Sequence, residues 1–179
     1  MRTVLAVVIL SVSAAAANAQ VAWVGAGLGT SWEHNPKTAP DRTWLHRTAD
    51  APEIFAAFPL DDDTNIRVTA SRVPYGVLHQ GLVWDGSFRT ITAGVDYFFP
   101  GTLGRFMFGG GLGQYTLDLA AKQPPAGLEE SYFGWYLSTG EWFPVTRRSR
   151  ITVELKMHRP SSPGHPTVVT AVAGFALGF

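Results

Sequence analysis

The C-terminal segment at residues 167–179 alternates strictly along its length. A period of two is the signature of a β-strand, because successive side chains point to opposite faces. The bulkier face carries Val169, Ala171, Ala173, Phe175, Leu177 and Phe179, and the opposite face carries Val168, Thr170, Val172, Gly174, Ala176 and Gly178. Neither face is charged, whereas a soluble sandwich would show charged residues to water. The pattern therefore predicts a strand of a transmembrane barrel, with large residues facing lipid and small ones facing a narrow interior.

Eight segments of this kind follow the N-terminal region, and most have the length that a tilted strand needs to cross a bilayer. They cover residues 20–32, 52–60, 65–75, 87–99, 105–119, 131–145, 151–159 and 167–179. Short connections alternate with longer ones, which lie at 33–51, 76–86, 120–130 and 160–166. The sequence therefore predicts an all-β fold, namely an eight-stranded antiparallel up-and-down transmembrane β-barrel.

Three local features refine this prediction. The triplet Gly109–Gly111 is expected to mark a bulge or a bend in the fifth strand, and Gly140 is expected to shift the register before Trp142. Aromatic residues gather near the predicted strand ends, where membrane barrels carry interfacial girdles. We expect two such belts, with Phe98, Phe99, Phe106 and Trp142 among the members of one and Tyr75, Tyr115, Tyr132 and Phe133 among those of the other.

Residues 1–19 have the pattern of a secretory signal peptide. Arg2 supplies the positive start, an apolar stretch begins at Val4, and Ala17-Asn18-Ala19 fits the small-x-small cleavage pattern. An anchoring helix is the alternative, but the apolar stretch is short for one. We expect cleavage after Ala19, so that residues 20–179 form the mature barrel domain.

Composition excludes several classes of function. The chain carries 14 Lys and Arg against 14 Asp and Glu, and this balance argues against a nucleic-acid partner, which would require a basic surface. It has no cysteine, and its five histidines do not show a metal-ligand spacing. We therefore expect no metal and no cofactor.

Four charged residues fall on the predicted inward faces: Arg67, Asp96, Glu154 and Lys156. Eight strands leave an interior that side chains can fill, and opposite charges buried there must pair because an isolated ion would be very costly. We predict a lumenal network of ion pairs and hydrogen bonds that plugs the barrel. The alternative is a narrow gated conduit in which the same charges select ions.

One segment permits an enzyme hypothesis. His158 and Ser161 lie together at the end of the seventh predicted strand, and Glu154 precedes His158 on the same inward face. A serine, a histidine and a carboxylate could carry out acyl transfer if they converged. An ordinary polar loop with prolines is the other interpretation, and we do not assign catalytic residues.

The whole mature chain resembles the small eight-stranded bacterial outer-membrane barrels, the class that includes the membrane domain of outer membrane protein A and its adhesin-like relatives. The resemblance rests on the signal peptide, the eight amphipathic strands, the alternation of short and long connections, and the terminal Phe179. It implies a place in the bacterial outer membrane, contact with its lipid, and recognition of the C-terminal strand, ending at Phe179, by the barrel-assembly machinery.

Four hypotheses of function follow. The first is a structural or surface-interaction barrel whose external loops meet an extracellular partner, and the second is a narrow outer-membrane pore. The third is a lipid A-modifying hydrolase that uses His158 and Ser161 or Ser162, because some eight-stranded outer-membrane barrels are lipid A deacylases. Their His-x-Ser motif differs from the spacing of His158 and Ser161, and no acidic residue follows His158. The fourth is a soluble periplasmic binder of lipocalin type.

Overall fold

The computed structural model describes residues 22–34, 45–47, 50–79, 82–119, 131–162 and 166–179. The expected signal peptide lies outside them. The described strands are β1 (Trp23–His34), β2 (Leu45–Arg47), β3 (Glu53–Pro59), β4 (Thr64–His79), β5 (Leu82–Pro100), β6 (Arg105–Leu119), β7 (Ser131–Thr146), β8 (Ser149–Pro160) and β9 (Thr167–Gly178). No helix in the described part of the chain is long and apolar enough to cross a membrane.

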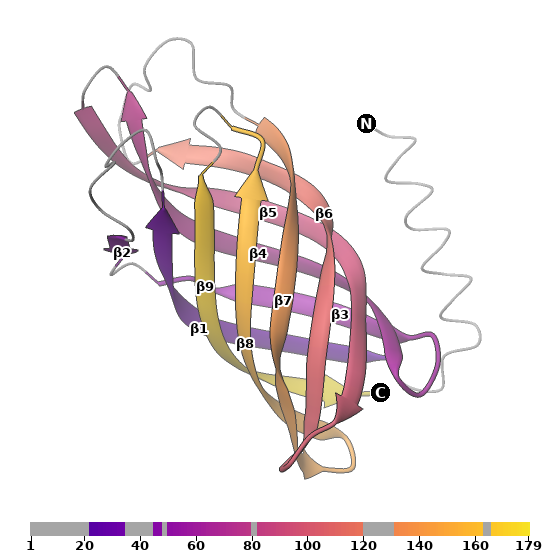
Figure 1. Ribbon diagram of the computed structural model, residues 1–179. Coiled ribbons are helices and arrows are strands. Elements are labelled where there is room, and N and C mark those ends of the chain that lie inside the picture. The colour runs from indigo at the N-terminus through magenta and orange to yellow at the C-terminus, as the bar shows by residue number, and fades with distance from the viewer. Residues whose placement is uncertain (1–21, 35–44, 48–49, 80–81, 120–130, 163–165) are drawn as a thin grey trace.

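The strands form a closed antiparallel barrel of eight strands (Figure 1). From β3 to β9 each strand pairs with the next, β1 pairs with β3, and β1 pairs with β9 from Trp23–Gly178 to His34–Thr167. Closure pairs each wall strand with a neighbour on both sides over most of its length, as a β-structure in lipid requires. The predicted fold is therefore confirmed. Only β2 lies outside the ring, as a three-residue strand on the end of β1.

The structure corrects one predicted loop and adds one strand. Residues 76–86 were expected to form a long connection, but β4 and β5 stay paired as far as His79 and Leu82. The alternation is hard to recognise there because Pro74, Gly76 and Gly86 interrupt the run of β-branched residues. The three-residue β2 escaped prediction because it is too short to show a period.

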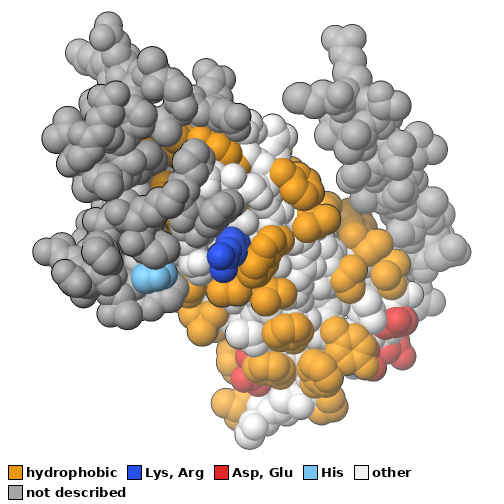
Figure 2. All heavy atoms as spheres, turned by 45° about the horizontal axis from the view of Figure 1, so that its top comes forward, with side chains coloured by type: hydrophobic (Ala, Val, Ile, Leu, Met, Phe, Trp, Pro, Cys, Tyr) orange, Lys and Arg blue, Asp and Glu red, His pale blue; other side chains and the backbone are white. Residues whose placement is uncertain are grey.

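The side chains alternate between a polar lumen and an apolar exterior. In β8, Thr152, Glu154 and Lys156 are buried, whereas Ile151 and Val153 are exposed. The same division holds in β9, where the face of Phe175 and Leu177 points outward. Hydrophobic side chains dominate the described surface in the view of Figure 2, with acidic side chains near one end. The faces predicted for these strands are confirmed.

Many of the aromatic residues assigned to interfacial belts lie inside the barrel instead. Two clusters fill the lumen above and below its middle. The loop-end cluster comprises Val73, Tyr75, Phe88, Tyr115, Tyr132 and Val168. The turn-end cluster comprises Phe55, Ala57, Phe98, Met107, Trp142 and Ala176. The expectation was wrong for Tyr75, Tyr115, Tyr132, Phe98 and Trp142, because a narrow eight-stranded lumen also needs bulky side chains. Phe99, Phe106 and Phe133 do face outward.

The predicted irregularities at the glycines are also absent from the register. Pairing of β5 with β6 and of β6 with β7 continues without a shift through Gly109–Gly111, and β7 pairs regularly with β8 at Gly140. The register shifts instead between Pro144 and Thr146, where proline cannot donate to the ladder. Gly109 serves packing, because a Cβ placed there would come within 2.1 Å of Asp96 Oδ1.

The wall differs locally where β3 is short. β3 pairs with β4 only as far as Glu53–Ser71, whereas β4 continues to His79. Beyond this point side chains of β1 reach the edge of β4. The Ser31 hydroxyl donates to the Pro74 carbonyl at 3.1 Å, and Glu33 Oε2 accepts from the Gly76 N–H at 2.7 Å.

Candidate functional site

The middle of the lumen contains five charged side chains, which we call the lumenal ion cluster. It consists of Glu53 from β3, Arg67 from β4, Asp96 from β5, and Glu154 and Lys156 from β8. All five are at least nine-tenths buried. Each points inward because strand periodicity places it opposite an outward-facing apolar residue.

Four members form a closed ring of alternating charge. Arg67 Nη1 donates to Glu154 Oε2 at 2.8 Å, and Arg67 Nη2 donates to Glu53 Oε1 at 3.0 Å. On the other side Lys156 Nζ lies 2.5 Å from Glu53 Oε2 and 3.3 Å from Glu154 Oε2. Each cation therefore contacts both glutamates, so that the charges within the ring balance.

Asp96 occupies a different position. Its Oδ2 lies 3.4 Å from Arg67 Nη1, a longer contact than those of either glutamate with this guanidinium. Its Oδ1 has no hydrogen-bond partner among the described residues. The structure thus brings all four sequence-predicted charges together, with Asp96 at the margin.

Aromatic side chains close the cluster on the turn side. Trp142 Nε1 donates to Glu154 Oε1 at 3.0 Å, and the Arg67 guanidinium lies over the Phe55 ring at 4.0 Å from its centroid. Phe98 packs against Trp142 with ring centroids 5.2 Å apart. These rings exclude water from the ion pairs, which strengthens each pair in its low-dielectric surroundings.

Glu53 is the member that sequence analysis missed. It stands at the first position of β3, next to a turn-like stretch, where an acidic residue is ordinarily solvated. One signal could have identified it. Ile54 points outward and Phe55 inward, so strand parity places Glu53 on the lumenal face as well.

The structure does not assemble the catalytic candidates into a triad. The Nδ1 of His158 lies 3.2 Å from the Tyr115 hydroxyl, and its Nε2 lies 3.4 Å from the Thr170 hydroxyl. Glu154 is held by Arg67, Lys156 and Trp142. Ser161 is exposed, and its N–H donates to the Phe133 carbonyl. Both histidine nitrogens are thus engaged with groups other than Ser161 and Glu154.

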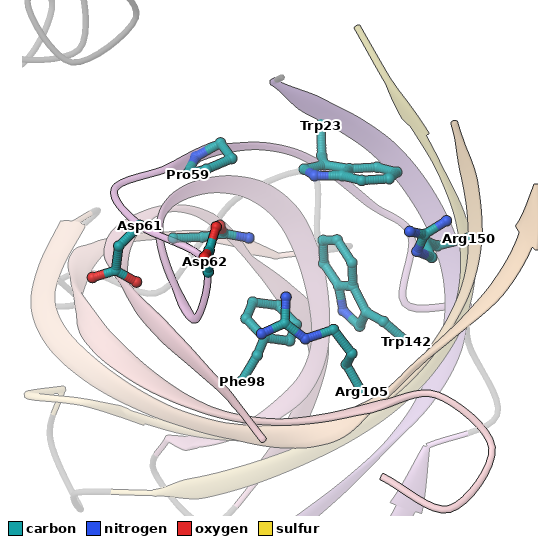
Figure 3. A pocket seen from close by; sticks show the side chains of 9 residues that line it. Trp23, Pro59, Asp61, Asp62, Phe98, Arg105, Trp142 and Arg150 are labelled. Carbon is teal, nitrogen blue, oxygen red and sulfur yellow. The ribbon is translucent and has the colours of Figure 1, made fainter. Parts of the chain in front are cut away.

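A pocket of about 250 Å³ opens at the end of the barrel that carries the short turns (Figure 3). Trp23, Trp142 and Arg150 line one side of it, and Asp61 and Asp62 line the other. The Arg150 guanidinium lies 4.9 Å from the centroid of the Trp23 ring.

The first residue of this acidic turn is held in its ionised form. A hydrogen bond from the Asp63 N–H, together with bonds from Thr64, keeps the pKa of Asp61 below its usual range. Nothing in the pocket selects one ligand chemistry, since both signs of charge line it. Within the described ranges no group of His, Cys, Asp and Glu side chains could hold a metal ion.

The chain was compared with known proteins, and the similarity found is to the fold of solved structures. No family model and no curated protein matches the chain. Among solved structures, Neisserial surface protein A aligns with a TM-score of 0.69 at 14% identity, covering 88% of this chain and 97% of that one. The attachment invasion locus protein Ail of Yersinia pestis, in complex with the heparin analogue sucrose octasulfate, aligns with a TM-score of 0.60 at 13% identity, covering 89% of this chain and 98% of that one.

A third match is the N-terminal β-barrel domain of Pseudomonas aeruginosa OprF, with a TM-score of 0.54 at 14% identity, covering 87% of this chain and 97% of that one. All three are small eight-stranded outer-membrane barrels. The chain has the fold of a small eight-stranded outer-membrane β-barrel. At these identities the likeness concerns the fold alone, and the lumenal ion cluster is described here from this chain's own residues.

Proposed function

We propose that this protein is a bacterial outer-membrane barrel with a lumen plugged by its own side chains, which acts as a structural or surface-interaction protein. One observation carries the proposal: the middle of the lumen is filled by a closed ring of ion pairs between two aromatic clusters. A plugged interior leaves the outer wall and the loops as the surfaces through which such a barrel can act.

The exterior supports the membrane location. The outward-facing side chains of the wall form an apolar surface that would be costly to expose to water, and the charged side chains of the middle lie in the lumen. A soluble lipocalin-type barrel would show the reverse division. The expected signal peptide, with cleavage after Ala19, supplies the route of export.

Fractionation tests the location. The full chain is expressed in a Gram-negative host, and the outer-membrane fraction is run on SDS gels with and without boiling. We expect a band in this fraction that shifts on heating, because a closed barrel resists SDS until it is unfolded. A soluble periplasmic protein without a heat shift would contradict the membrane assignment and favour the lipocalin-type binder.

The surface-interaction role rests on the predicted loops at 33–51, 120–130 and 160–166, much of which lies outside the described residues, and on the ends of β4 and β5 at His79 and Leu82. Ail, a structural neighbour, was solved with a heparin analogue. For this chain we propose an extracellular partner of unspecified chemistry. Replacing residues 35–50, the greater part of the longest predicted loop, by a short Gly-Ser linker is expected to abolish adhesion of expressing cells while the heat-shifting band remains. Unchanged adhesion would contradict the proposed role of this loop.

The C-terminal strand is proposed to contact the barrel-assembly machinery. Phe179 follows β9 and exchanges backbone hydrogen bonds with Ala22, while its side chain is 70% exposed and within reach of a partner. Deleting Phe179 is expected to reduce the amount of heat-shifting protein in the outer membrane, whereas the purified variant should still fold in detergent. Equal assembly of the variant and the natural chain in cells would contradict this assignment.

A narrow pore is the second candidate, favoured by the charged side chains in the lumen. It predicts measurable conductance in planar bilayers that changes when Glu154 or Lys156 is neutralised. A lipid A hydrolase would change lipid A acylation on expression and lose this effect in His158→Ala. The geometry favours the plugged barrel over both, because the ring of ion pairs blocks the lumen and His158 is engaged by Tyr115 and Thr170.

A further inference from the structure

The lumenal ion cluster does not balance its own charge. It contains three carboxylates but only two cations, so that one negative charge is left over when all five groups are ionised. An uncompensated charge in a buried site costs several kcal/mol, on the order of that for an ion pair that has lost one partner. The cluster must therefore take up one positive charge or leave one carboxylate neutral.

The geometry identifies Asp96 as the extra carboxylate. The two glutamates share both cations in the closed ring, and each accepts two or more charged hydrogen bonds. Asp96 makes one contact with Arg67, at 3.4 Å, and its Oδ1 is without a partner in the described structure. Its relative exposure is 0%, so that bulk water does not solvate it.

A second unpartnered polar atom lies on the same part of the wall. The hydroxyl of Tyr136 in β7 is buried and has no hydrogen-bond partner among the described residues. It lies 2.5 Å from the position that a Cβ on Gly94 would take, and Gly94 precedes Asp96 by two residues on the same face of β5. Asp96 Oδ1 and the Tyr136 hydroxyl are thus both buried without a hydrogen-bond partner in the described structure, and so is Arg67 Nε.

We propose that Asp96 is a proton-binding site: in the folded barrel it is a neutral carboxylic acid at neutral pH, and its proton completes the charge balance of the lumenal ion cluster. The ring of Arg67, Glu154, Lys156 and Glu53 keeps the ion pairs described above. The proposal goes beyond the proposed function and needs only that the barrel is folded in lipid or detergent.

The neighbouring groups agree with this assignment. The charged or titratable side chains about Asp96 are Glu53 from β3, Arg67 from β4, Tyr136 from β7, and Glu154 and Lys156 from β8. One further base, His158, stands on the face of Lys156, two residues along β8. A proton on His158 would place a second positive charge beside Lys156. Asp96 is therefore a better site for the additional proton than His158.

Infrared spectroscopy on the folded natural chain tests the proposal directly. Every described aspartate except Asp96 is exposed to solvent. With isotope-labelled aspartate, the carbonyl stretch of a protonated carboxylic acid should therefore appear at neutral pH and be lost in Asp96→Asn. Absence of this band from the natural chain would overturn the proposal, whether or not any variant folds.

Unfolding by urea in lipid vesicles supplies an independent readout. Unfolding exposes Asp96, which releases its proton above a pH of about 3.9, so stability must fall as pH rises. Relative to Asp96→Asn, the unfolding equilibrium constant of the natural chain should rise about tenfold per pH unit from mildly acidic to neutral pH. The contributions of the other titratable groups cancel when the unfolding constant of the natural chain is divided by that of Asp96→Asn.

Two matched variants separate the alternatives. Glu154→Gln removes a carboxylate from the balanced ring and should unfold at lower urea than Asp96→Asn at every pH. His158→Gln should keep the pH dependence of the natural chain. The proposal fails if Asp96→Asn is as unstable as Glu154→Gln and the ratio of unfolding constants between the natural chain and Asp96→Asn does not change with pH. It also fails if His158→Gln abolishes the pH dependence of the unfolding constant.

Discussion

At the scale of the residue, Arg67 is the centre of the lumen. It contacts Glu53, Asp96 and Glu154 through its guanidinium and lies over the Phe55 ring. Its planar group with several fixed donors suits this role, and a lysine could not make the same set of bonds.

Removing this guanidinium should destabilise the barrel strongly. Arg67→Met keeps much of the side-chain volume but leaves the surplus of buried carboxylates still larger. We expect a loss of about 3–5 kcal/mol in the free energy of unfolding, as for other broken buried ion pairs. Urea titration in vesicles measures it. The exposed Arg89, paired with Asp118 on the surface, is the control, and Arg89→Met should cost about 0–1 kcal/mol.

A glycine determines the space available to Asp96. A Cβ at Gly109 would come within 2.1 Å of Asp96 Oδ1 and 2.9 Å of the Ser138 hydroxyl. Gly109→Ala should therefore displace Asp96 and lower the urea midpoint. Combining it with Asp96→Ala should recover part of the loss, because the smaller side chain removes the closest contact, whereas the Val95 carbonyl would still lie 2.9 Å from the added methyl group. Additive losses in the double variant would contradict this steric account.

At the scale of the element, strand parity was predictable and position along the barrel was not. The period of two in a strand fixes which face each side chain takes, and Arg67, Asp96, Glu154 and Lys156, each expected on an inward face, are buried in the structure. It does not fix which cation meets which carboxylate. That depends on the stagger between strands such as β3 and β8, which are far apart in sequence and meet only across the lumen.

The aromatic residues illustrate the same limit. Trp142 and Phe98 were recognised as lying near a strand end, but the end of a strand has an inner and an outer face, and both tolerate aromatic rings. The parity of β7 was obscured by Gly140 and Glu141, so that the lumenal position of Trp142 could not be deduced. Whether such a ring faces the lumen or the exterior depends on contacts across the lumen, which no local sequence pattern encodes.

The outward face of β8 offers a test of lipid contact. Val153 is exposed near the middle of the strand, whereas Val145 is exposed beside the turn that precedes β8. Val153→Arg should reduce stability in vesicles by about 2–4 kcal/mol and Val145→Arg by about 0–1 kcal/mol, because the cost of a charge depends on its depth in the bilayer. Equal costs at both positions would contradict the expected immersion of the wall.

At the scale of the whole molecule, the lumen is a layered plug of two aromatic clusters separated by the ion cluster. Reconstituted at low density in planar bilayers, the natural chain should show no steady ionic current. Current steps that respond to neutralising Glu154 or Lys156 would instead favour the narrow pore. The heat-shifted band verifies in both cases that the sample is folded.

The short β3 has a mechanical consequence for this closed wall. Between β1 and the far end of β4, bonds from Ser31 and Glu33 replace the continuous backbone ladder found along the other seams. Among the described residues, side-chain bonds rather than a backbone ladder join β1 to this part of β4, whereas separating β4 from β5 would require breaking a ladder that runs from Thr64 to His79. The barrel wall is therefore expected to open first between β1 and the far end of β4. Deuterium should enter first along this seam, at the Gly76 amide, while the amides of the β4–β5 ladder remain protected.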